Sequence, residues 1–566
     1  GRAGVSAADG RFTITGVTTI LGPIGALARI PQDGLVLSGR SVYTAAVRGG
    51  VTPVGDITLG LRKVWDGGGN SDSWHDAANW NDDRVPAAED DVYIPVTGTV
   101  SFAGYNQPIH SLRSDGQLTV RSGGLSLTGD GILRGATNLQ GGQLASAAGI
   151  TLTGVFSWTN GELAGPGRIV LENSFVAAGD NLYVNNAALV NRGAGSWRRG
   201  HLNLTYGASV ENAAGASLEI AASATLAHYY SQGAAPQMRN AGVITVATTG
   251  VLQMGLPLVN DGAIRVQTGE LLLNGALTHN GALTVAPGAT LRLGNNAVGV
   301  LTPASTVTGG GTVILSTYQW STQSLSFAGR YTLAGMTQVL NGNNVISPTA
   351  TFSTESLVLS AGRVEAHTGI TVTNVLTWSN VTLAGPGATY VAQRVELDNS
   401  NRLLDGHTLR NGGQARWQGT IRGANGALWH NLPGATLEIP GDVNTNWWDR
   451  GAQPAVRNEG ALRKVAPATT ADLNGAITNT GVIEVLSGTL TLPASTTTAG
   501  LLRVSQGATV TLSAATHQVL PSGVISNSGQ IILASGVLTV AGRYDGPGVT
   551  QANGGRIAVA PGSQAV

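Results

Sequence analysis

Short alternating runs of apolar and polar residues recur along most of the chain, separated by turns rich in glycine. In residues 239–285 an apolar pair returns about every twenty residues, as Ile244 with Val246, Ile264 with Val266, and Leu283 with Val285. Neighbouring side chains on a strand face opposite ways, so each pair faces inwards and the residue between its members faces outwards. A second alternating run follows each time, in "TGVLQM", "TGELLL" and "PGATLRL". The pattern predicts at least two short strands in every repeat.

The repeating unit is 19–21 residues long, with two clear strands and a third, more variable one. A unit of this size cannot bury its own apolar face and must stack on copies of itself. We therefore expect an all-β chain that winds as a right-handed parallel β-helix, a β-solenoid whose turns are about 4.8 Å apart.

Asparagine recurs at one point of this unit, as Asn240, Asn260 and Asn280. Amide side chains at equivalent places on stacked strands can bond to one another along the stack. These three residues are therefore predicted to form a structural ladder.

A longer repeat is superimposed on the short one. Three segments return about 220 residues later: 149–167 as 369–387, 211–220 as 430–439, and 233–246 as 451–464. We expect a tandem duplication of roughly eleven turns per copy. The first copy is placed at 96–315 and the second at 316–535, and residues 536–566 begin a further copy or form the C-terminal end.

Turns of the form N-x-G-x-I-x-V…G-x-L-x-L, across residues 92–566, resemble those of filamentous-haemagglutinin-like proteins and autotransporter passengers. The resemblance implies a secreted or surface-exposed bacterial protein.

Residues 1–62 follow a different pattern, with two-residue alternation at 8–17, 43–50 and 54–59. These runs resemble the later strands of a carboxypeptidase-regulatory-like β-sandwich, so a partial N-terminal β-sandwich is expected. Either the chain begins within this domain, or another molecule supplies the missing strands.

Residues 63–95 combine three tryptophans with many acidic residues. The open end of a β-helix exposes apolar interior and unpaired strand edges. Trp65, Trp74 and Trp80 are therefore predicted to cap that end.

The oxygen-rich side chains of the same segment also allow a calcium site between residues 66 and 91. Its candidate ligands are Asp66, Asp72, Asp76, Asp82 and Asp83, with Asn70, Asp90 and Asp91 nearby. The spacing matches neither an EF-hand nor a nonapeptide calcium repeat, and calcium would be compatible with a cap.

Two aromatic pairs occupy equivalent places in the long repeat: Tyr229 with Tyr230, and Trp447 with Trp448. Adjacent side chains on an extended strand cannot both face the core, so at least one ring of each pair is expected outside. The pairs either fold back on the solenoid wall or contact a partner or a sugar. Four tryptophans that stand alone in their turns are expected in core or turn packing: Trp158, Trp378, Trp197 and Trp417.

The composition excludes several classes of protein. Charged residues are only 11% of the chain, and the 32 basic residues equal the 32 acidic ones, which argues against nucleic acid as a partner. No stretch approaches the apolar length of a transmembrane segment, and the absence of cysteine excludes disulfides and thiolate sites. Catalytic candidates are weak: Arg198, Arg199 and His201 stand without acids beside them, and Asp405 with His407 lacks a nucleophile.

We therefore expect a non-catalytic extracellular structural protein, a β-solenoid stalk or filament subunit with an adhesin-like surface. Its expected partners are copies of itself or a surface glycan, without a cofactor unless calcium binds. The alternatives are a carbohydrate-binding or polysaccharide-degrading β-helix enzyme, and a passive region of a larger exoprotein.

Overall fold

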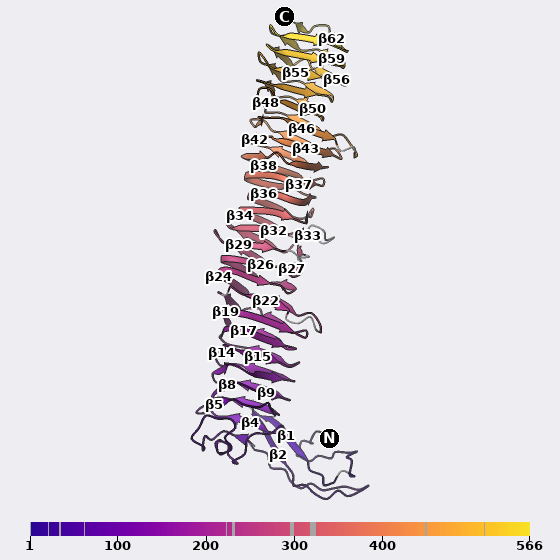
Figure 1. Ribbon diagram of the computed structural model, residues 1–566. Helices are drawn as coiled ribbons and strands as arrows, with labels where there is room; N and C mark the ends of the chain where they lie inside the picture. Colours follow the sequence, from indigo (N-terminus) through magenta and orange to yellow (C-terminus); the bar gives the residue numbers. More distant parts are fainter. Residues whose placement is uncertain are drawn as a thin grey trace. The chain divides into compact units, whose positions relative to one another are not determined.

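The computed structural model describes residues 2–20, 22–32, 35–60, 63–221, 223–228, 233–294, 299–316, 324–447, 450–513 and 515–565. It is 58% strand and 1% helix, and it contains a parallel β-solenoid of about 22 turns (Figure 1). The expected fold class is therefore confirmed. The chain divides into two compact units, Gly1–Val210 with Tyr229–Ala235, and Glu211–His228 with Pro236–Val566.

The N-terminal residues of the first unit form one antiparallel hairpin, β1 (Leu27–Gln32) with β2 (Leu35–Arg40). No strand occurs at 8–17, 43–50 or 54–59, where alternation predicted strands. An alternating pattern gives a strand only where a neighbouring strand completes its hydrogen bonds. These segments have an isolated bridge at Thr44, and another lies at Gly60, just after the third segment. The structure does not confirm the partial β-sandwich.

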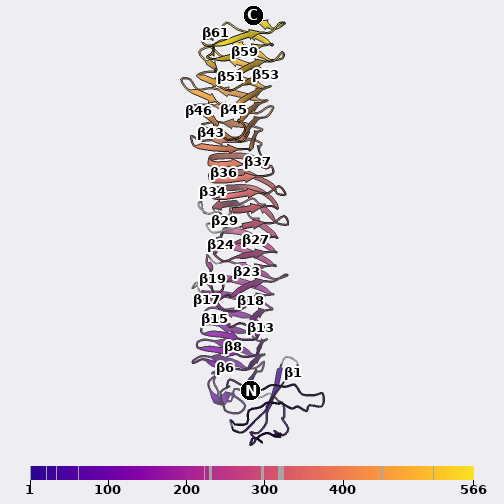
Figure 2. The same ribbon diagram turned by 90° about the vertical axis from the view of Figure 1, so that its right-hand side faces the viewer.

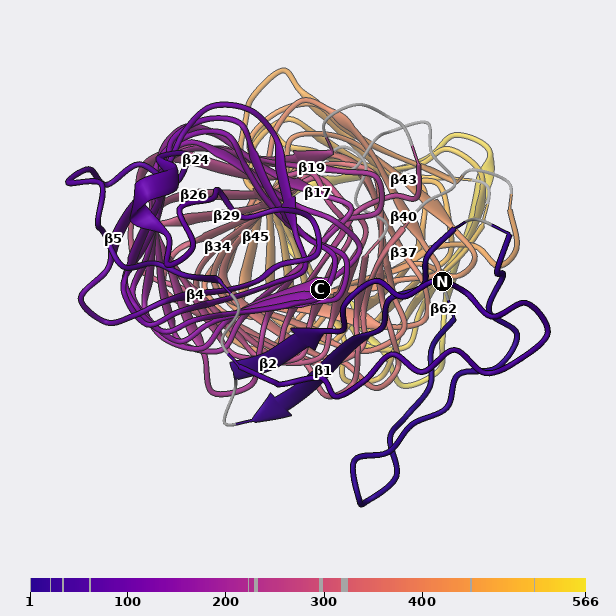
Figure 3. The same cartoon turned by 90° about the horizontal axis from the view of Figure 1, so that it is seen from below.

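The hairpin is held to the first turn of the solenoid by charged residues, at the place where Figure 3 shows β1 and β2. Arg29 Nε lies 3.2 Å from Asp91 Oδ2, and Asp91 also accepts from Ser111 Oγ at 2.6 Å. Burial by itself raises the pKa of Asp91, but the hydrogen bonds of Ser111 and His110 and the charge of Arg29 outweigh it, so this pKa is lowered.

Three parallel series of strands build the solenoid turns of the first unit. The first series is β4 (Asp91–Ile94), β7 (Ser111–Ser114), β10 (Asp130–Leu133), β13 (Gly149–Leu152), β16 (Arg168–Leu171) and β18 (Ala188–Asn191). The second is β5 (Thr99–Phe102), β8 (Gln117–Val120), β11 (Thr137–Leu139) and β14 (Phe156–Trp158). The third is β6 (Gln107–Ile109), β9 (Gly124–Leu127), β12 (Gln143–Ser146) and β15 (Gly161–Ala164). β17 (Phe175–Asn185) and β19 (Ala194–Thr205) continue the second series and then the third.

In the second unit the three series define faces A, B and C. Face A contains β23 (Gln237–Asn240), β25 (Leu258–Asn260), β27 (Leu277–His279), β30 (Gly299–Leu301), β33 (Ser324–Phe327), β35 (Asn343–Ile346), β40 (Asn401–Asp405), β43 (Gly419–Ala424), β46 (Val443–Trp447), β49 (Thr470–Leu473), β52 (Thr489–Leu492), β55 (Thr509–Leu512), β58 (Gln530–Leu533) and β61 (Val549–Ala552).

Face B contains β21 (Ser217–Ile220), β28 (Ala282–Val285), β31 (Thr306–Gly309), β38 (Ala388–Val391), β41 (Thr408–Asn411), β44 (Leu428–Asn431), β47 (Ala455–Asn458), β50 (Ala476–Asn479), β53 (Thr496–Thr498), β56 (Thr516–Val519), β59 (Gly536–Val540) and β62 (Gly555–Val559).

Face C contains β22 (Thr225–His228), β29 (Thr290–Leu293), β32 (Thr312–Ser316), β39 (Arg394–Leu397), β42 (Gln414–Arg416), β45 (Thr436–Ile439), β48 (Ala461–Lys464), β51 (Val482–Val485), β54 (Leu501–Val504), β57 (Val524–Asn527), β60 (Arg543–Asp545) and β63 (Gln564–Ala565).

Long strands pass round the corners between these faces. β24 (Val243–Met254), β26 (Ala263–Leu273) and β34 (Arg330–Asn341) run from face B to face C, and β36 (Thr351–Ala366) and β37 (Ile370–Ala384) continue to face A. Figure 2 shows β34, β36 and β37 on consecutive turns.

The inward columns predicted from the short repeat are present. Ile244 pairs with Ile264, and Ile264 pairs with Leu283 on the next turn. All three side chains are buried, whereas Arg265 and Thr284 of the same strands are exposed. These turns therefore bury their apolar residues in a continuous column.

Candidate functional site

The three tryptophans of residues 63–95 form one buried cluster on the first solenoid turn. The ring of Trp80 lies 5.2 Å from that of Trp65 and 4.9 Å from that of Trp74, centroid to centroid. Trp74 contacts Phe102 of β5 at 5.6 Å, edge to face. The indole of Trp80 donates to the carbonyl of Trp74 at 2.8 Å. These contacts pack the cluster against β5 of the first turn, and its role as a cap stays a prediction.

The acidic side chains of this segment bond to their own neighbours. Asp82 accepts from the buried Lys63 at 2.5 Å and from Arg84 at 2.7 Å. Burial by itself raises the pKa of Asp82, but the hydrogen bonds and charges of both cations outweigh it, so the pKa is lowered. Asp76 caps the short helix η1 (Ala77–Asn79) by accepting from the backbone of Ala78.

The remaining candidate calcium ligands are Asp66, which accepts from the backbone of Gly68, and the exposed Asp72 and Asp83. Among the residues that the structure describes, no group of three or more acidic or histidine side chains is placed to hold a metal ion. A calcium site in this segment stays a sequence-based hypothesis.

A ladder of buried amides runs through face A. Asn212 donates to Asn240 at 2.8 Å, and Asn240 donates to Asn260 at 2.6 Å. Each rung also bonds to a carbonyl near the corner, as Asn240 does to Ala263 at 3.1 Å. Because both ends of every amide find partners, the polar column is compatible with a dry interior.

The third predicted rung, Asn280, was assigned wrongly. Asn260 pairs instead with His279, whose Nδ1 lies 2.8 Å from the Asn260 amide nitrogen. This turn takes 19 residues rather than 20, and a shift of one residue moves a side chain to the other side of a strand. Asn280 lies just past the end of β27 and donates to Asp261 outside at 2.7 Å.

A second ladder occupies the equivalent part of the long repeat. Asn411, Asn431, Asn458 and Asn479 donate in succession at 2.8, 2.8 and 2.7 Å. All four are buried. Only the long repeat pointed to this ladder, because the number of residues between its asparagines varies from turn to turn.

The two ladders lie on different faces. Asn458 is the sequence equivalent of Asn240, yet it belongs to β47 on face B, in the column that contains Val246. Lys464 is in turn the equivalent of Val246 and belongs to face C. The long repeat is therefore a whole number of turns plus one strand, so equivalent segments are displaced by one face.

Two cations of the second copy point inwards where the first copy has apolar residues. Lys464 is fully buried and donates to the carbonyl of Ala466 at 2.8 Å and to the hydroxyl of Thr469. Burial lowers its pKa. Arg402, the equivalent of Leu182, donates to the carbonyls of Trp378 at 2.7 Å and Gln418 at 2.9 Å. Arg402 also pairs with the carboxylate of Asp398 at 2.5 Å, so both cations have several partners close by.

The four isolated tryptophans are all buried. Trp158 and Trp378, at equivalent positions, donate to the carbonyls of Gly161 and Val381 at 3.3 and 2.9 Å. Trp197 donates to Arg199 at 3.1 Å, and Trp417 stacks on Trp429 at 4.9 Å.

Of the two candidate aromatic pairs, the structure describes only Trp447, and Tyr229, Tyr230 and Trp448 lie outside the described residues. Trp447 ends β46 and is 43% exposed. Two backbone hydrogen bonds join Arg450 and Ala452 to the tight turn at Asn425 and Gly426, which lies on the preceding circuit of the solenoid. The backbone amide of Asn425 donates to the carbonyl of Arg450 at 2.8 Å, and that of Gly426 donates to the carbonyl of Ala452 at 2.7 Å.

The same turn connects to a polar network on face A that the sequence did not reveal. The amide of Asn425 donates to Asp405 at 2.5 Å, and Arg363 lies 3.6 Å from Asp405 and 3.2 Å from Glu365. Because Arg363 joins acids from strands two turns apart, only the fold brings this network together.

Asn425 has a left-handed backbone, with a φ of 52°, and its equivalent Tyr206 has the same φ. This conformation is unusual for a tyrosine. Tyr206 is 45% exposed, so the first copy also places an exposed aromatic at this turn.

The weak catalytic candidates do not come together. Arg199 pairs with Asp180 at 3.1 Å on an exposed surface, and Arg198 bonds to Ser196. Asp405 faces outwards, whereas His407 is buried and bonds to Thr389 at 2.9 Å. Burial lowers the pKa of His407 to about 4, so this imidazole is neutral at physiological pH.

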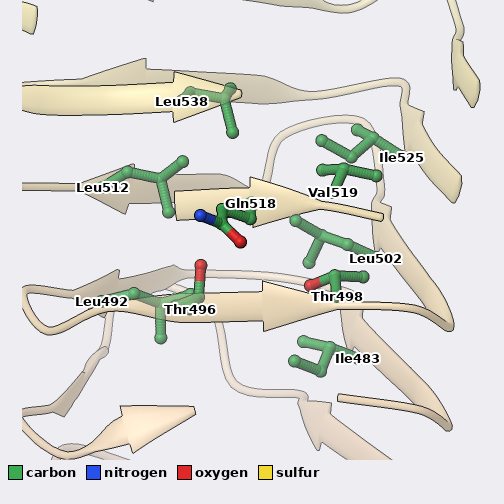
Figure 4. Close-up of a pocket in the computed structure, with 10 residues that line it drawn as sticks. All are labelled: Ile483, Leu492, Thr496, Thr498, Leu502, Leu512, Gln518, Val519, Ile525 and Leu538. Carbon is green, nitrogen blue, oxygen red and sulfur yellow. The ribbon is translucent and has the colours of Figure 1, made fainter. Parts of the chain in front are cut away.

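A small interior cavity lies near the C-terminal turns, between side chains such as Leu492, Thr496, Leu512 and Ile525 (Figure 4). Its volume of about 20 Å³ is room for about one water molecule. It is too small for a sugar ring.

The chain is thus a parallel β-solenoid protein in which buried asparagines bond to one another along the stack. No protein-family model, curated protein or solved structure matches the chain. Within the described residues, no helix has the length and apolar character needed to span a membrane.

Proposed function

We propose that this protein is a non-catalytic structural protein of the bacterial exterior, a solenoid stalk or fibre subunit with an adhesive surface. The observation that carries the proposal is the parallel pairing of strands from turn to turn within each unit, which continues past a few register shifts and is accompanied by buried ladders of asparagines. In such a stack, stability is a sum over turns and their interfaces, which suits a load-bearing spacer.

The placement of the charged residues also supports this proposal. The buried cations Lys63, Arg402 and Lys464 bond to nearby carbonyls, hydroxyls or acids rather than to an open cleft. The surface acids Asp180, Glu365 and Asp405 are paired with arginines. The resemblance of the turns to adhesin-type repeats supports the extracellular location, and copies of the same chain or a glycan are the proposed partners.

Electron microscopy of the purified protein tests this function. We expect elongated particles, either isolated or joined end to end. Compact particles would contradict the proposal. The enzyme alternative is tested in parallel by incubating the protein with acidic and neutral polysaccharides and measuring new reducing ends, and turnover above that of heat-denatured protein would refute a non-catalytic role.

A further inference from the structure

One outward column on face B runs without interruption through consecutive turns. It consists of Thr245, Arg265, Thr284, Thr308, Thr332, Ser353, Thr371, Tyr390, Arg410, His430, Arg457, Thr478, Thr497, Gln518 and Thr539. None of these side chains is buried. We call it the face B column. It presents hydroxyls on most turns and an aromatic and basic group at its centre.

The face B column contains cations but no carboxylate. Within the described part of the chain, Arg265 and Arg410 have no ion pair or side-chain hydrogen bond. Arg457 pairs with Glu459 beside the column, at 2.5 Å, and His430 lies 2.9 Å from the same carboxylate. The uncompensated charge at the centre of the column is therefore that of Arg410.

The outward column of face C is arranged in the opposite way. Acids and bases alternate along it, as Glu396, Arg416, Glu438, Arg463, Glu484 and Arg503. Arg463 and Arg503 lie 2.9 and 3.0 Å from the two oxygens of Glu484. Face C neutralises its own charge, so the free cations of face B are not a general property of the outer wall.

Tyr390 and Arg410 are specific to the second copy of the long repeat. Their equivalents are the buried Val170 and Val190, which pair in the same way on consecutive turns. Tyr390 is 38% exposed and Arg410 is also exposed. The second copy therefore replaces a covered apolar pair with an accessible aromatic and a guanidinium.

The residues beside Tyr390 are also smaller and less charged than their equivalents in the first copy. In the first copy Arg192 donates to Glu172 at 2.8 Å, and the equivalent residues of the second copy are Gly412 and Ala392. A Cβ atom at Gly412 would lie 2.8 Å from the Tyr390 ring. The glycine thus makes room for the ring, and the loss of the ion pair leaves the surface open beside it.

We propose that the face B column binds an acidic polysaccharide whose chain runs along the stack, with Tyr390 and Arg410 as its main contacts. A tyrosine ring offers a flat apolar face for a sugar ring, and a guanidinium donates two parallel hydrogen bonds to a carboxylate. The turns repeat every 4.8 Å or so, which gives a linear polymer hydroxyl partners in a line. This inference rests on the proposed function, because it names the partner class of the adhesive surface.

Binding of polygalacturonate to the full chain, measured by biolayer interferometry at low salt, tests the inference. Arg410→Val and Tyr390→Val install the residues of the equivalent turn, and each is expected to weaken binding about tenfold. The control Arg503→Val removes an equal charge from face C, and its affinity is expected to stay within about twofold of the original protein. Circular dichroism of all three variants checks that the solenoid is intact.

Three results would overturn the inference: no binding by the original protein, equal losses in the test and control variants, or equally strong binding of neutral dextran or polyglutamate. If binding fails while micrographs show elongated particles, the inference is refuted and the proposed stalk stands. Compact particles would refute the stalk whether or not the polysaccharide binds.

Discussion

The two copies of the long repeat differ most clearly in where the solenoid places them. Asn240 and Asn458 are equivalent in sequence and both are ladder rungs, but one lies on face A and the other on face B. A rung needs a polar partner at the paired position of the next turn, and each face of the solenoid offers such positions. A buried asparagine is therefore tolerated wherever the neighbouring turns place another polar side chain in register with it, whichever face it lies on.

The copies also differ in what they bury. Lys464 and Arg402 occupy inward positions where the first copy has Val246 and Leu182. A buried charge is tolerated only when it is well bonded. Carbonyls supply part of those bonds, and the Asp398 carboxylate and the Thr469 hydroxyl supply the rest. A buried cation is therefore easier to accommodate near a corner of the solenoid, where carbonyl groups can accept its hydrogen bonds, than in the middle of a flat sheet.

The largest effect is expected from removing the buried indoles. Trp378→Ala should lower the free energy of unfolding by about 4 kcal/mol, because it leaves a large cavity. Trp158→Ala should cost about 1 kcal/mol less, since only Trp378 also packs near the Arg402 guanidinium, 6.0 Å from its ring centroid. Urea denaturation followed by circular dichroism measures both. Equal losses would show that Arg402 adds nothing to this site.

The next effect is on the ladder. Asn431→Leu should cost about 3 kcal/mol, because Asn458 and Asn411 lose a buried partner. Asn280→Ala is the matched control, and a change within about 0.5 kcal/mol is expected because this side chain lies outside the ladder. If the two variants were equally stable, the ladder would carry no energy.

Acid should then separate the copies, because His407 corresponds to an alanine, Ala187, in the first copy. Burial lowers the pKa of His407 from 6.5 to about 4. The unfolded chain therefore binds a proton first as the pH falls, and stability that is complete above pH 6.5 should decline by about 3 kcal/mol by pH 4.

His407→Gln keeps a hydrogen-bonding side chain at this position without titrating in that range. The free energy of unfolding, measured by denaturation at several pH values between 7 and 4, should fall less steeply with pH for this variant than for the original protein. An unchanged slope would mean that the imidazole is accessible to protons in the folded state.

The smallest effect concerns Lys464. Lys464→Val installs the residue of the first copy. The free energy of unfolding should fall by no more than about 1 kcal/mol, and it could increase. Burial lowers the pKa of Lys464, so the folded state carries a penalty for the charge, and that penalty fades as the pH approaches the ordinary value of 10.5. A large loss of stability at neutral pH would show that its bonds to Ala466 and Thr469 are essential.

The architecture could be predicted because it is local and repeated. The alternation of Ile244, Thr245 and Val246 defines the inward and outward sides of a strand, and repetition then requires stacking. The error at Asn280 arose because one turn is a residue shorter, which the average period conceals. The prediction of strands at 8–17, 43–50 and 54–59 was wrong because a strand forms only when it pairs with another strand. The alternation of residues contains no information about that pairing.

The surface could not be predicted in the same way. The face B column joins residues that are about twenty apart in sequence, and its meaning depends on which neighbours lack a carboxylate. The network of Arg363 with Asp405 likewise spans two turns. Exposed aromatics such as Trp447 stood out in the sequence, but Tyr390 did not, because its importance depends on Arg410 on the next turn and on the space at Gly412.

The most direct test of the account uses the absence of native cysteine. Thr245→Cys with Arg265→Cys, and separately Thr478→Cys with Thr497→Cys, place two thiols on adjacent turns. Dibromobimane, which fluoresces when it bridges two nearby thiols, should label both pairs rapidly and should label Thr245→Cys with Thr284→Cys, two turns apart, far less. Equal labelling of the three pairs, or none in the adjacent ones, would contradict the in-register parallel stack.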